Sequence, residues 1–260
     1  MFQKELNHPI FQIVSEESQK LGFQTFVVGG FVRDIFLKRT SKDVDFVTVG
    51  SGIELATAVR KRLKKAHLSV FKNFGTAQLK TDDWEFEFVG ARKESYDRNS
   101  RKPKVEDGTF EDDIYRRDFT INALAISLNA PKYGELIDLF GGMEDLKKGL
   151  IRTPLDPKIT FSDDPLRMMR AARFATQLNF TLVPETLEAL KTEAHRLSII
   201  SQERITDELQ KIIKSAKPSI GFTLLFDTKL LHLFFPEMVR LQGVEVREGK
   251  GHKDNFYHTL

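Results

Sequence analysis

The fold is decided by residues 26–49, which read FVVGGFVRDIFLKRTSKDVDFVTV. The stretch opens as a short apolar strand, breaks at Gly29 and Gly30, and resumes with the apolar spacing of a helix over residues 32–37. Its last part, Asp43–Val49, returns to the alternating pattern of a strand. We therefore predict a strand, a glycine turn, a helix and a second strand in direct succession.

The neighbouring segments extend this prediction over the first half of the chain. Apolar spacing indicates helices at residues 11–20 and 53–66, and β-like runs lie at residues 69–71, 76–80 and 84–89. Together these elements predict a small mixed sheet with helices packed against it, which is an α+β arrangement.

The rest of the chain changes character twice. Residues 94–113 are polar and aperiodic, so we expect a long loop there, whereas residues 117–127 return to an apolar helical pattern. From residue 151 onward, one helical pattern follows another. We therefore expect an α+β head at residues 1–150 and an all-α neck and body at residues 151–245.

The composition is that of a globular protein and limits the cellular compartments in which we expect it. The 260 residues allow one or two domains with a buried core. There is no cysteine, which excludes disulfides and thiolate metal sites and fits our expectation of a cytoplasmic protein. The N-terminal run lacks the features of a signal peptide. No apolar stretch approaches the ~20 residues that span a bilayer, so we expect no membrane partner.

Basic residues gather in four places, although the formal net charge is only +3. The clusters lie at residues 61–65, 98–104, 147–152 and 167–173. A single cluster of this kind is most often a solvated surface, so the clusters gain meaning only together with motifs that point to a polyanionic partner.

The glycine turn of FVVGGFVRD is suited to phosphate. Glycine lets a ligand approach the backbone closely, and the free amides at the start of a helix attract phosphate oxygens. Arg33, one turn into the predicted helix, would add a charge-assisted contact. By itself, a Gly-Gly pair of this kind is more often an ordinary turn.

Paired carboxylates follow on the second strand. Asp43 and Asp45 share one face because side chains alternate along a strand, and Glu87 of the run DDWEFEFVG would bring a third carboxylate if its strand is a neighbour. Such carboxylates suit divalent ions that promote in-line phosphoryl transfer. A solvated strand is the plainer alternative for two acids spaced in this way.

Six motifs occur in an order that resembles one family. They are GGFVRD, DVD, RRDFTINALA (116–125), DLFGGMEDL (138–146), DDPLRMMRAARFA (163–175) and ERITDEL (203–209). Together they resemble class II CCA-adding enzymes and bacterial poly(A) polymerases, of the DNA-polymerase-β-like nucleotidyltransferase superfamily. The resemblance covers about residues 23–209, with Asp163 and Asn179 standing where the family commonly has Glu and Gly.

The resemblance implies roles for the matching positions. Asp43 and Asp45 would hold two Mg²⁺ ions, and Glu87, which the strand pattern and not the resemblance supplies, would be a third catalytic carboxylate. The substrates would be CTP, ATP and a tRNA 3′ end, to which C and A are added with release of pyrophosphate. The nucleotide would be bound by residues of three motifs: Gly29, Gly30, Arg33, Arg117, Asp118, Asp164, Arg167, Arg170 and Arg173.

Base selection by Asp164 and Arg167 can also be argued physically, because residues three apart on a helix share one face. A carboxylate accepts hydrogen bonds and a guanidinium donates them. Asp164 would therefore accept from the exocyclic amine of cytosine or adenine, while Arg167 would donate to the adjacent ring nitrogen. Uracil and guanine reverse both matches. The alternative is a surface ion pair between the two residues.

Three other readings stay open. A poly(A) polymerase, or an enzyme that adds only CC or only A, shares all six motifs. A non-catalytic RNA-binding module would have the fold without the activity. The end of the chain, GHKDNFYHTL, resembles the opening of an HD-type phosphohydrolase domain, so we expect residues 246–260 to begin a domain that continues in a longer protein.

Overall fold

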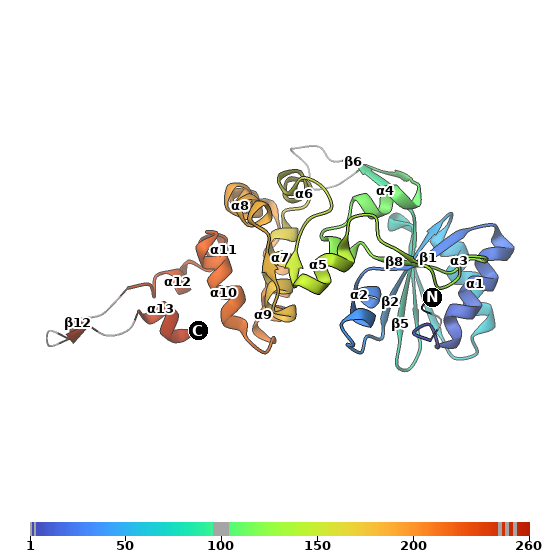
Figure 1. The fold of residues 1–260 in the computed structure, drawn as a ribbon, viewed down its shortest axis with the longest axis horizontal. Coiled ribbons are helices and arrows are strands. Elements are labelled where there is room, and N and C mark those ends of the chain that lie inside the picture. The colour runs from blue at the N-terminus through green and yellow to red at the C-terminus, as the bar shows by residue number, and fades with distance from the viewer. Residues whose placement is uncertain (1, 3, 96–103, 244–245, 248–249, 252–253) are drawn as a thin grey trace. The chain divides into compact units, whose positions relative to one another are not determined.

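The computed structural model describes residues 2, 4–95, 104–243, 246–247, 250–251 and 254–260 (Figure 1). These residues form two compact units. The first, here called the head unit, contains the described residues up to Leu146, and the second, the helical unit, contains those from Lys147 onward.

The head unit is built on a seven-stranded sheet in the order β3-β4-β5-β2-β1-β8-β9. Strands β2 and β5 pair in parallel, and every other neighbouring pair is antiparallel. The strands are β1 (Gln24–Val28), β2 (Asp43–Val49), β3 (His67–Phe71), β4 (Thr76–Lys80), β5 (Glu85–Gly90), β8 (Ala125–Ser127) and β9 (Leu136–Ile137). The predicted small mixed sheet is confirmed.

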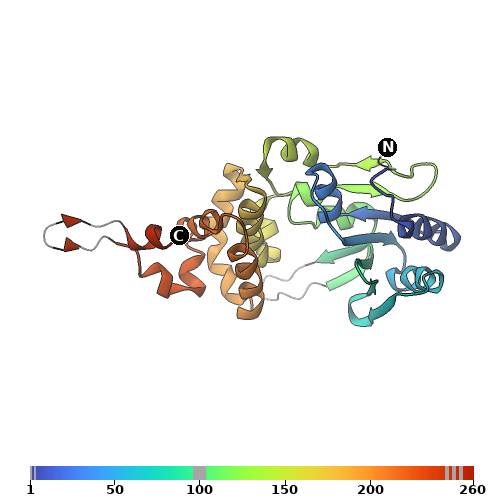
Figure 2. The same cartoon turned by 90° about the horizontal axis from the view of Figure 1, so that it is seen from below.

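Helices α1 (Pro9–Leu21) and α3 (Gly52–Arg62) pack on each other and against this sheet, and both lie on one side of it in Figures 1 and 2. The core beneath them is aromatic. Phe46 of β2 stacks on Phe88 of β5 with ring centroids 4.9 Å apart, and Phe11 of α1 meets Phe46 edge-on at 6.0 Å. All three rings are fully buried. The polar side chains of β2 and β5 therefore point to the opposite face.

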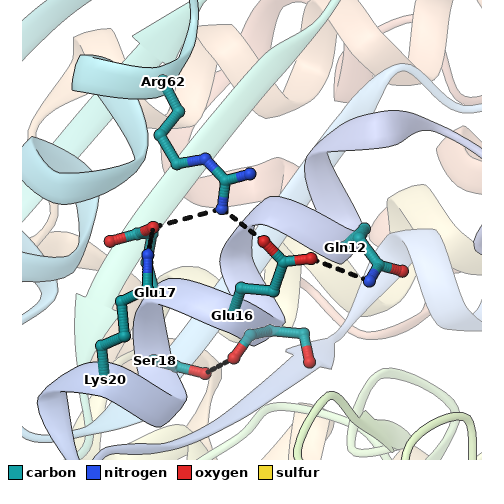
Figure 3. Close-up of polar contacts among 7 residues, drawn as sticks. Gln12, Glu16, Glu17, Ser18, Lys20 and Arg62 are labelled. Atoms are coloured by element: carbon teal, nitrogen blue, oxygen red, sulfur yellow. Dashed lines mark hydrogen bonds and ion pairs between the residues drawn. The ribbon is translucent and has the colours of Figure 1, made fainter.

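One arginine fastens the two helices at the surface (Figure 3). Arg62, the last residue of α3, donates to Glu16 at 2.5 Å and to Glu17 at 3.2 Å, both on α1. The hydrogen bond from Arg62 holds the pKa of Glu16 below its usual value. Because the pair with Glu16 is open to solvent, its contribution to stability is small. The two glutamates nevertheless neutralise the positive charge of Arg62.

Helix α2 (Gly30–Phe36) follows the glycine turn as predicted, but three other expectations need correction. The helix expected at residues 53–66 ends at Arg62, because Leu63 adopts an extended conformation and β3 begins four residues later. Part of the loop expected at residues 94–113 is ordered. Strands β6 (Arg92–Ser95) and β7 (Lys104–Asp107) pair there, while residues 96–103 lie outside the described part.

The third correction concerns residues 117–127, which do not form a helix. They contain a 3-10 turn, Thr120–Asn122, followed by strand β8. A continuous apolar run does not distinguish a buried strand from a buried helix, and here the ladder with β1 decides in favour of the strand. The remaining head helices are α4 (Phe110–Tyr115) and α5 (Gly142–Lys148), whose last residues pass into the helical unit.

The helical unit has α7 (Leu166–Leu178) at its centre, in contact with α9 (Gln202–Ile213) and α10 (Pro218–Asp227). Gly221 of α10 allows this close approach, because a Cβ there would lie 2.5 Å from Thr176 Oγ1. The other helices are α6 (Pro157–Asp163), α8 (Pro184–Glu193), α11 (Leu231–Phe234), α12 (Pro236–Val239) and α13 (Asn255–Thr259).

Short strands add to this helical pattern. Leu150–Ile151 (β10) pairs in parallel with Thr181–Leu182 (β11), and Val246–Arg247 (β12) pairs with Lys250–Gly251 (β13). Across the described ranges, no helix is both long and apolar enough to pass through a membrane.

The first residue of α5, Gly142, offers a test of the packing of the head unit. A Cβ at Gly142 would lie 2.3 Å from the carbonyl oxygen of Thr120, so we expect Gly142→Ala to lower the free energy of unfolding by about 1–3 kcal/mol. Urea unfolding can be followed by the fluorescence of Trp84, the sole tryptophan and part of the head unit.

The matched control is Gly141→Ala. Gly141 has φ +72° but open space at its Cβ position, so this variant measures backbone strain alone, about 1–2 kcal/mol. Equal losses for the two variants would show that crowding against Thr120 is unimportant.

Candidate functional site

Four carboxylates lie on the open face of two adjacent strands. Asp43 and Asp45 alternate with Val44 and Phe46 on β2, and the two apolar side chains are fully buried. In the parallel register, Asp43 is opposite Glu85 and Asp45 is opposite Glu87. Neighbouring strands are about 4.8 Å apart, so the prediction that the strand of Glu87 lies next to the strand of Asp43 and Asp45 is confirmed.

The crowding of like charges changes the proton affinity of this face. Burial, and then the negative charge of Glu85, raise the pKa of Asp43 above its usual value. Burial and the charge of Asp43 raise the pKa of Glu87, although Arg92 acts in the opposite direction and solvent still reaches the Glu87 side chain. The ionised carboxylates therefore repel each other, and a cation placed between them would relieve this repulsion.

The glycine turn passes between a carboxylate and a guanidinium of the site. Gly29 follows β1 with φ +76°, a backbone conformation that favours glycine. A Cβ at this position would lie 3.3 Å from Asp45 Oδ2 and 3.2 Å from Arg117 Nη1. The predicted residues Gly29, Asp45 and Arg117 are thus brought together by β1, β2 and the segment before β8.

Arg33 is held in place by a chain of hydrogen bonds. Its Nη1 donates to Asn122 Oδ1 at 2.7 Å, and Asn122 Nδ2 donates to Asp118 Oδ1 at 3.1 Å. Arg33 and Asp118 are both buried, and a Cβ on Gly30 would lie 3.6 Å from Arg33 Nη2. This arrangement fixes the guanidinium beside Gly30, with Asn122 as the link between Arg33 and Asp118.

Arg117 is positioned by a buried acid. Asp113 of α4 is fully buried and accepts a hydrogen bond from Arg117 Nη2 at 3.0 Å and further bonds from Arg116. A buried carboxylate is tolerated when it is paired in this way. The sequence prediction missed both Asp113 and Asn122. Asn122 lies inside the motif RRDFTINALA, and Asp113 lies three residues before it, so only their spacing from Arg116 and Arg117 offered a signal.

In the helical unit, Asp164 is not on the same helix as Arg167, so this part of the prediction is wrong. Helix α6 ends at Asp163 and α7 begins at Leu166, because Pro165 disfavours a helical conformation at the residue before it. Asp164 instead caps α7, since its Oδ1 accepts from the backbone N–H of Leu166 at 3.2 Å. The backbone N–H of Arg167 donates to Asp164 O at 3.0 Å, which keeps the two residues adjacent.

A further residue contacts Asp164 that the sequence prediction did not include. Arg204 of α9 approaches Asp164 Oδ2 with its Nη2 at 3.5 Å, and both side chains of this pair are partly exposed to solvent. Arg204 belongs to the motif ERITDEL, which carries part of the family resemblance but predicts no contact with Asp164.

Arg170 and Arg173 lie three positions apart on α7, and both approach one aromatic ring. Their guanidinium carbons lie 5.5 and 4.2 Å from the ring centre of Phe174. Arg173 also forms an ion pair with the buried Glu208 of α9, with Nε 2.9 Å from Oε2. Glu208 therefore neutralises much of the charge of Arg173 within the helical unit.

The carboxylates of the head unit suit a divalent ion that is also bound by substrate and water. Among the residues that the structure describes, no three Asp, Glu, His or Cys side chains are arranged to hold one ion. Magnesium needs only one or two protein carboxylates, because water and phosphate oxygens complete its shell. Asp43 and Asp45, which share one face of β2 and include a carboxyl of raised proton affinity at Asp43, fit this requirement.

The fold and this site define the class of the protein. Residues 25–152 match the family "Poly A polymerase head domain", and residues 179–241 match "Probable RNA and SrmB-binding site of polymerase A". The chain belongs to this family of nucleotidyltransferases, as the resemblance of the six motifs predicted. Families of this kind are generally metal-dependent.

Within the family, the chain is similar to tRNA nucleotidyltransferases. It is 44% identical over 194 residues to the A-adding tRNA nucleotidyltransferase of Aquifex aeolicus, covering 74% of this chain and 23% of that protein. It is 38% identical to the CCA-adding enzyme of Bacillus velezensis, covering 87% and 54%. The chain thus spans about a quarter and about half of the lengths of these two relatives.

A solved structure supports the same likeness. The structure described as a tRNA nucleotidyltransferase complexed with a primer tRNA and an incoming ATP analog superimposes with a TM-score of 0.75 at 34% identity. The match covers 87% of this chain and 65% of that one.

The raised pKa of Asp43 predicts how this side chain affects stability. A carboxyl whose pKa is raised by folding binds its proton more tightly in the folded state, so stability falls as pH rises from the usual carboxyl value through the folded one. Asp43→Asn should therefore increase the free energy of unfolding near pH 7 in chelator, and have no effect near pH 3.

The control for this prediction is Asp83→Asn, which removes an exposed acid of the same unit. Magnesium should stabilise the wild-type chain and the Asp83 variant more than Asp43→Asn. A loss of stability in Asp43→Asn at neutral pH would contradict the proposed repulsion.

Proposed function

We propose that this chain contains the catalytic part of a tRNA nucleotidyltransferase that adds C and A from CTP and ATP to the tRNA 3′ end. In this reaction the RNA 3′-hydroxyl attacks the α-phosphate, a new phosphodiester bond forms, and pyrophosphate leaves. The observation that carries the proposal is the meeting of Asp45, Gly29 and Arg117 in the head unit. It supplies an acid for a metal ion, close backbone access and a cation for phosphate at one place.

The proposed roles in the head unit follow from charge and access. Two Mg²⁺ ions held by Asp43 and Asp45 would activate the hydroxyl and stabilise the leaving pyrophosphate. Gly29 and Gly30 admit the triphosphate to the backbone at the start of α2, and Arg33 and Arg117 neutralise its charge. Glu87, opposite Asp45, is proposed as the third carboxylate.

Base selection is proposed for Asp164 and Arg167 of the helical unit. Asp164 accepts from the exocyclic amine of cytosine or adenine, and Arg167 donates to the neighbouring ring nitrogen. The capping bond from Leu166 supports this role because it fixes the orientation of the Asp164 carboxylate. Arg170 and Arg173 are proposed to contact phosphates or RNA. Because the proposed partner is tRNA, the reaction is proposed to take place in the cytoplasm.

A narrower specificity is the second candidate. The Aquifex aeolicus relative is named for A addition alone, and the Bacillus velezensis relative for CCA addition. Incubating a tRNA that lacks its 3′ CCA with CTP alone, ATP alone and both nucleotides distinguishes these activities by product length. CCA addition requires both nucleotides for the full product, whereas a poly(A) polymerase extends with ATP alone.

Removal of Asp43 tests the catalytic proposal. Asp43→Ala should reduce nucleotide incorporation by about 100-fold or more, because the metal ions lose a ligand. Asp83→Ala, which removes an exposed acid in the turn before β5, should retain wild-type activity. Incorporation by Asp43→Ala at the wild-type rate would sink the proposal.

Replacement of the base-selecting pair tests specificity. Asp164→Ala and Arg167→Ala should each raise incorporation of UTP or GTP relative to CTP and ATP, since each lost match is worth about 1–3 kcal/mol. Arg240→Ala serves as the control, because Arg240 is an exposed arginine of the same unit that pairs with Glu237. Equal loss with all four nucleotides would point to a folding defect instead of a change in selection.

A further inference from the structure

The outer edge of the head sheet exposes apolar side chains beside lysines. Val70 and Phe71 at the end of β3 are 39% and 46% exposed, and Phe74 in the following turn is 69% exposed. Three exposed large apolar side chains within five residues are more than the single scattered exposures that are normal on a protein surface. We define the β3 strip as the exposed apolar and lysine residues of the segment that runs from the end of α3 through β3 to the following turn: Lys61, Lys64, Lys65, Val70, Phe71, Lys72 and Phe74.

The charge of this region has one sign. Residues 60–74 contain six Lys and Arg residues and no Asp or Glu. Arg62 is occupied by Glu16 and Glu17 (Figure 3), and Arg60 donates to the carbonyl oxygen of Leu63. The four lysines of the β3 strip are exposed and form no ion pair with the described part of the chain. Their charge is therefore available to an anionic partner.

The register of the sheet relates the β3 strip to the catalytic carboxylates. Asp43, Glu85, Lys80 and His67 lie in one row across β2, β5, β4 and β3. Three strand spacings separate the ends of this row, which is about 15 Å. Strand β3 therefore begins about 15 Å from Asp43 and leads away from this row to the turn at Phe74.

We propose that the β3 strip binds the single-stranded part of the RNA substrate upstream of its 3′ end. Lysines contact the phosphates, and Phe71 and Phe74 stack on bases, which is the combination that proteins use for single-stranded nucleic acid. The proposal rests on the proposed function, because it assumes that the RNA 3′ end reaches Asp43.

Other occupants fit the β3 strip less well. A second copy of the chain would bring the same unbalanced positive charge to the contact and be repelled. An anionic membrane would attract the lysines, but membrane-surface segments are typically amphipathic helices with a broad apolar face, and this surface is an edge strand and a tight turn. RNA is therefore the partner whose charge and aromatic bases match both parts of the strip.

Two variants separate the proposed contributions. In the first, Phe71→Ala and Phe74→Ala are combined, and in the second Lys61, Lys64, Lys65 and Lys72 are all replaced by Gln. The matched controls are Tyr257→Ala, which removes an exposed ring outside the strip, and Lys20→Gln with Lys42→Gln, which removes lysines that pair with acids of the head unit. Trp84 fluorescence during urea unfolding confirms that each variant is folded.

Binding is measured without nucleotide, by fluorescence anisotropy of a labelled single-stranded RNA of about twelve nucleotides over a range of salt concentrations. The phenylalanine variant should bind about five-fold or more weakly, through lost stacking. The lysine variant should show a shallower dependence of log Kd on log salt, by about 0.7 for each lost phosphate contact. In incorporation assays, both variants should raise KM for RNA and leave KM for CTP unchanged.

The outcomes separate this inference from the proposed function. Wild-type affinity and salt dependence in both variants would overturn the β3 strip as an RNA surface, whatever the catalytic activity. Binding to phosphatidylserine vesicles in place of RNA, lost in the same variants, would overturn it as well. Failure of the proposed function would appear separately, as normal incorporation by Asp43→Ala, and would leave the RNA-binding measurement intact.

Discussion

The close approach of the backbone at Gly29 to both Asp45 and Arg117 is the constraint on which the head unit depends. A side chain at this position would crowd the carboxylate of Asp45 and the guanidinium of Arg117, and the positive φ would strain any residue with a Cβ. The arrangement requires β1 to end beside β2, and the antiparallel register provides this by pairing Val28 with Asp45. The buried Asp113 then holds Arg117 from the other side.

Electrostatic repulsion among the carboxylates is balanced by packing on the reverse side of the same strands. Phe46 and Phe88 stack beneath α1 and α3, so β2 and β5 cannot separate to relieve the charges of Asp43 and Glu87 without opening an aromatic core. Removing one large buried ring costs about 3–5 kcal/mol, which explains how a small domain can keep like charges together.

Local patterns in the sequence predicted the parts of the fold that local physics controls. Strand β2 begins and ends where the alternation of Asp43–Val49 indicated, and the glycine turn leads into a helix. The strand at Ala125–Ser127 was mistaken for a helix because its partner, β1, is about a hundred residues away in the chain. The role of Asn122 was missed for the same reason, since its hydrogen bond to Arg33 is invisible in local sequence.

The parallel pairing of β2 and β5 has a consequence for how this domain can vary. Parallel neighbours require a crossover, and here α3, β3 and β4 supply it. The β3–β4 turn at residues 72–75 lies at the outermost point of that excursion, so extra residues there add only a slowly growing loop-closure entropy. The length of this turn is therefore independent of the register between β1, β2 and β5 that sets the spacing of Gly29 and the two aspartates.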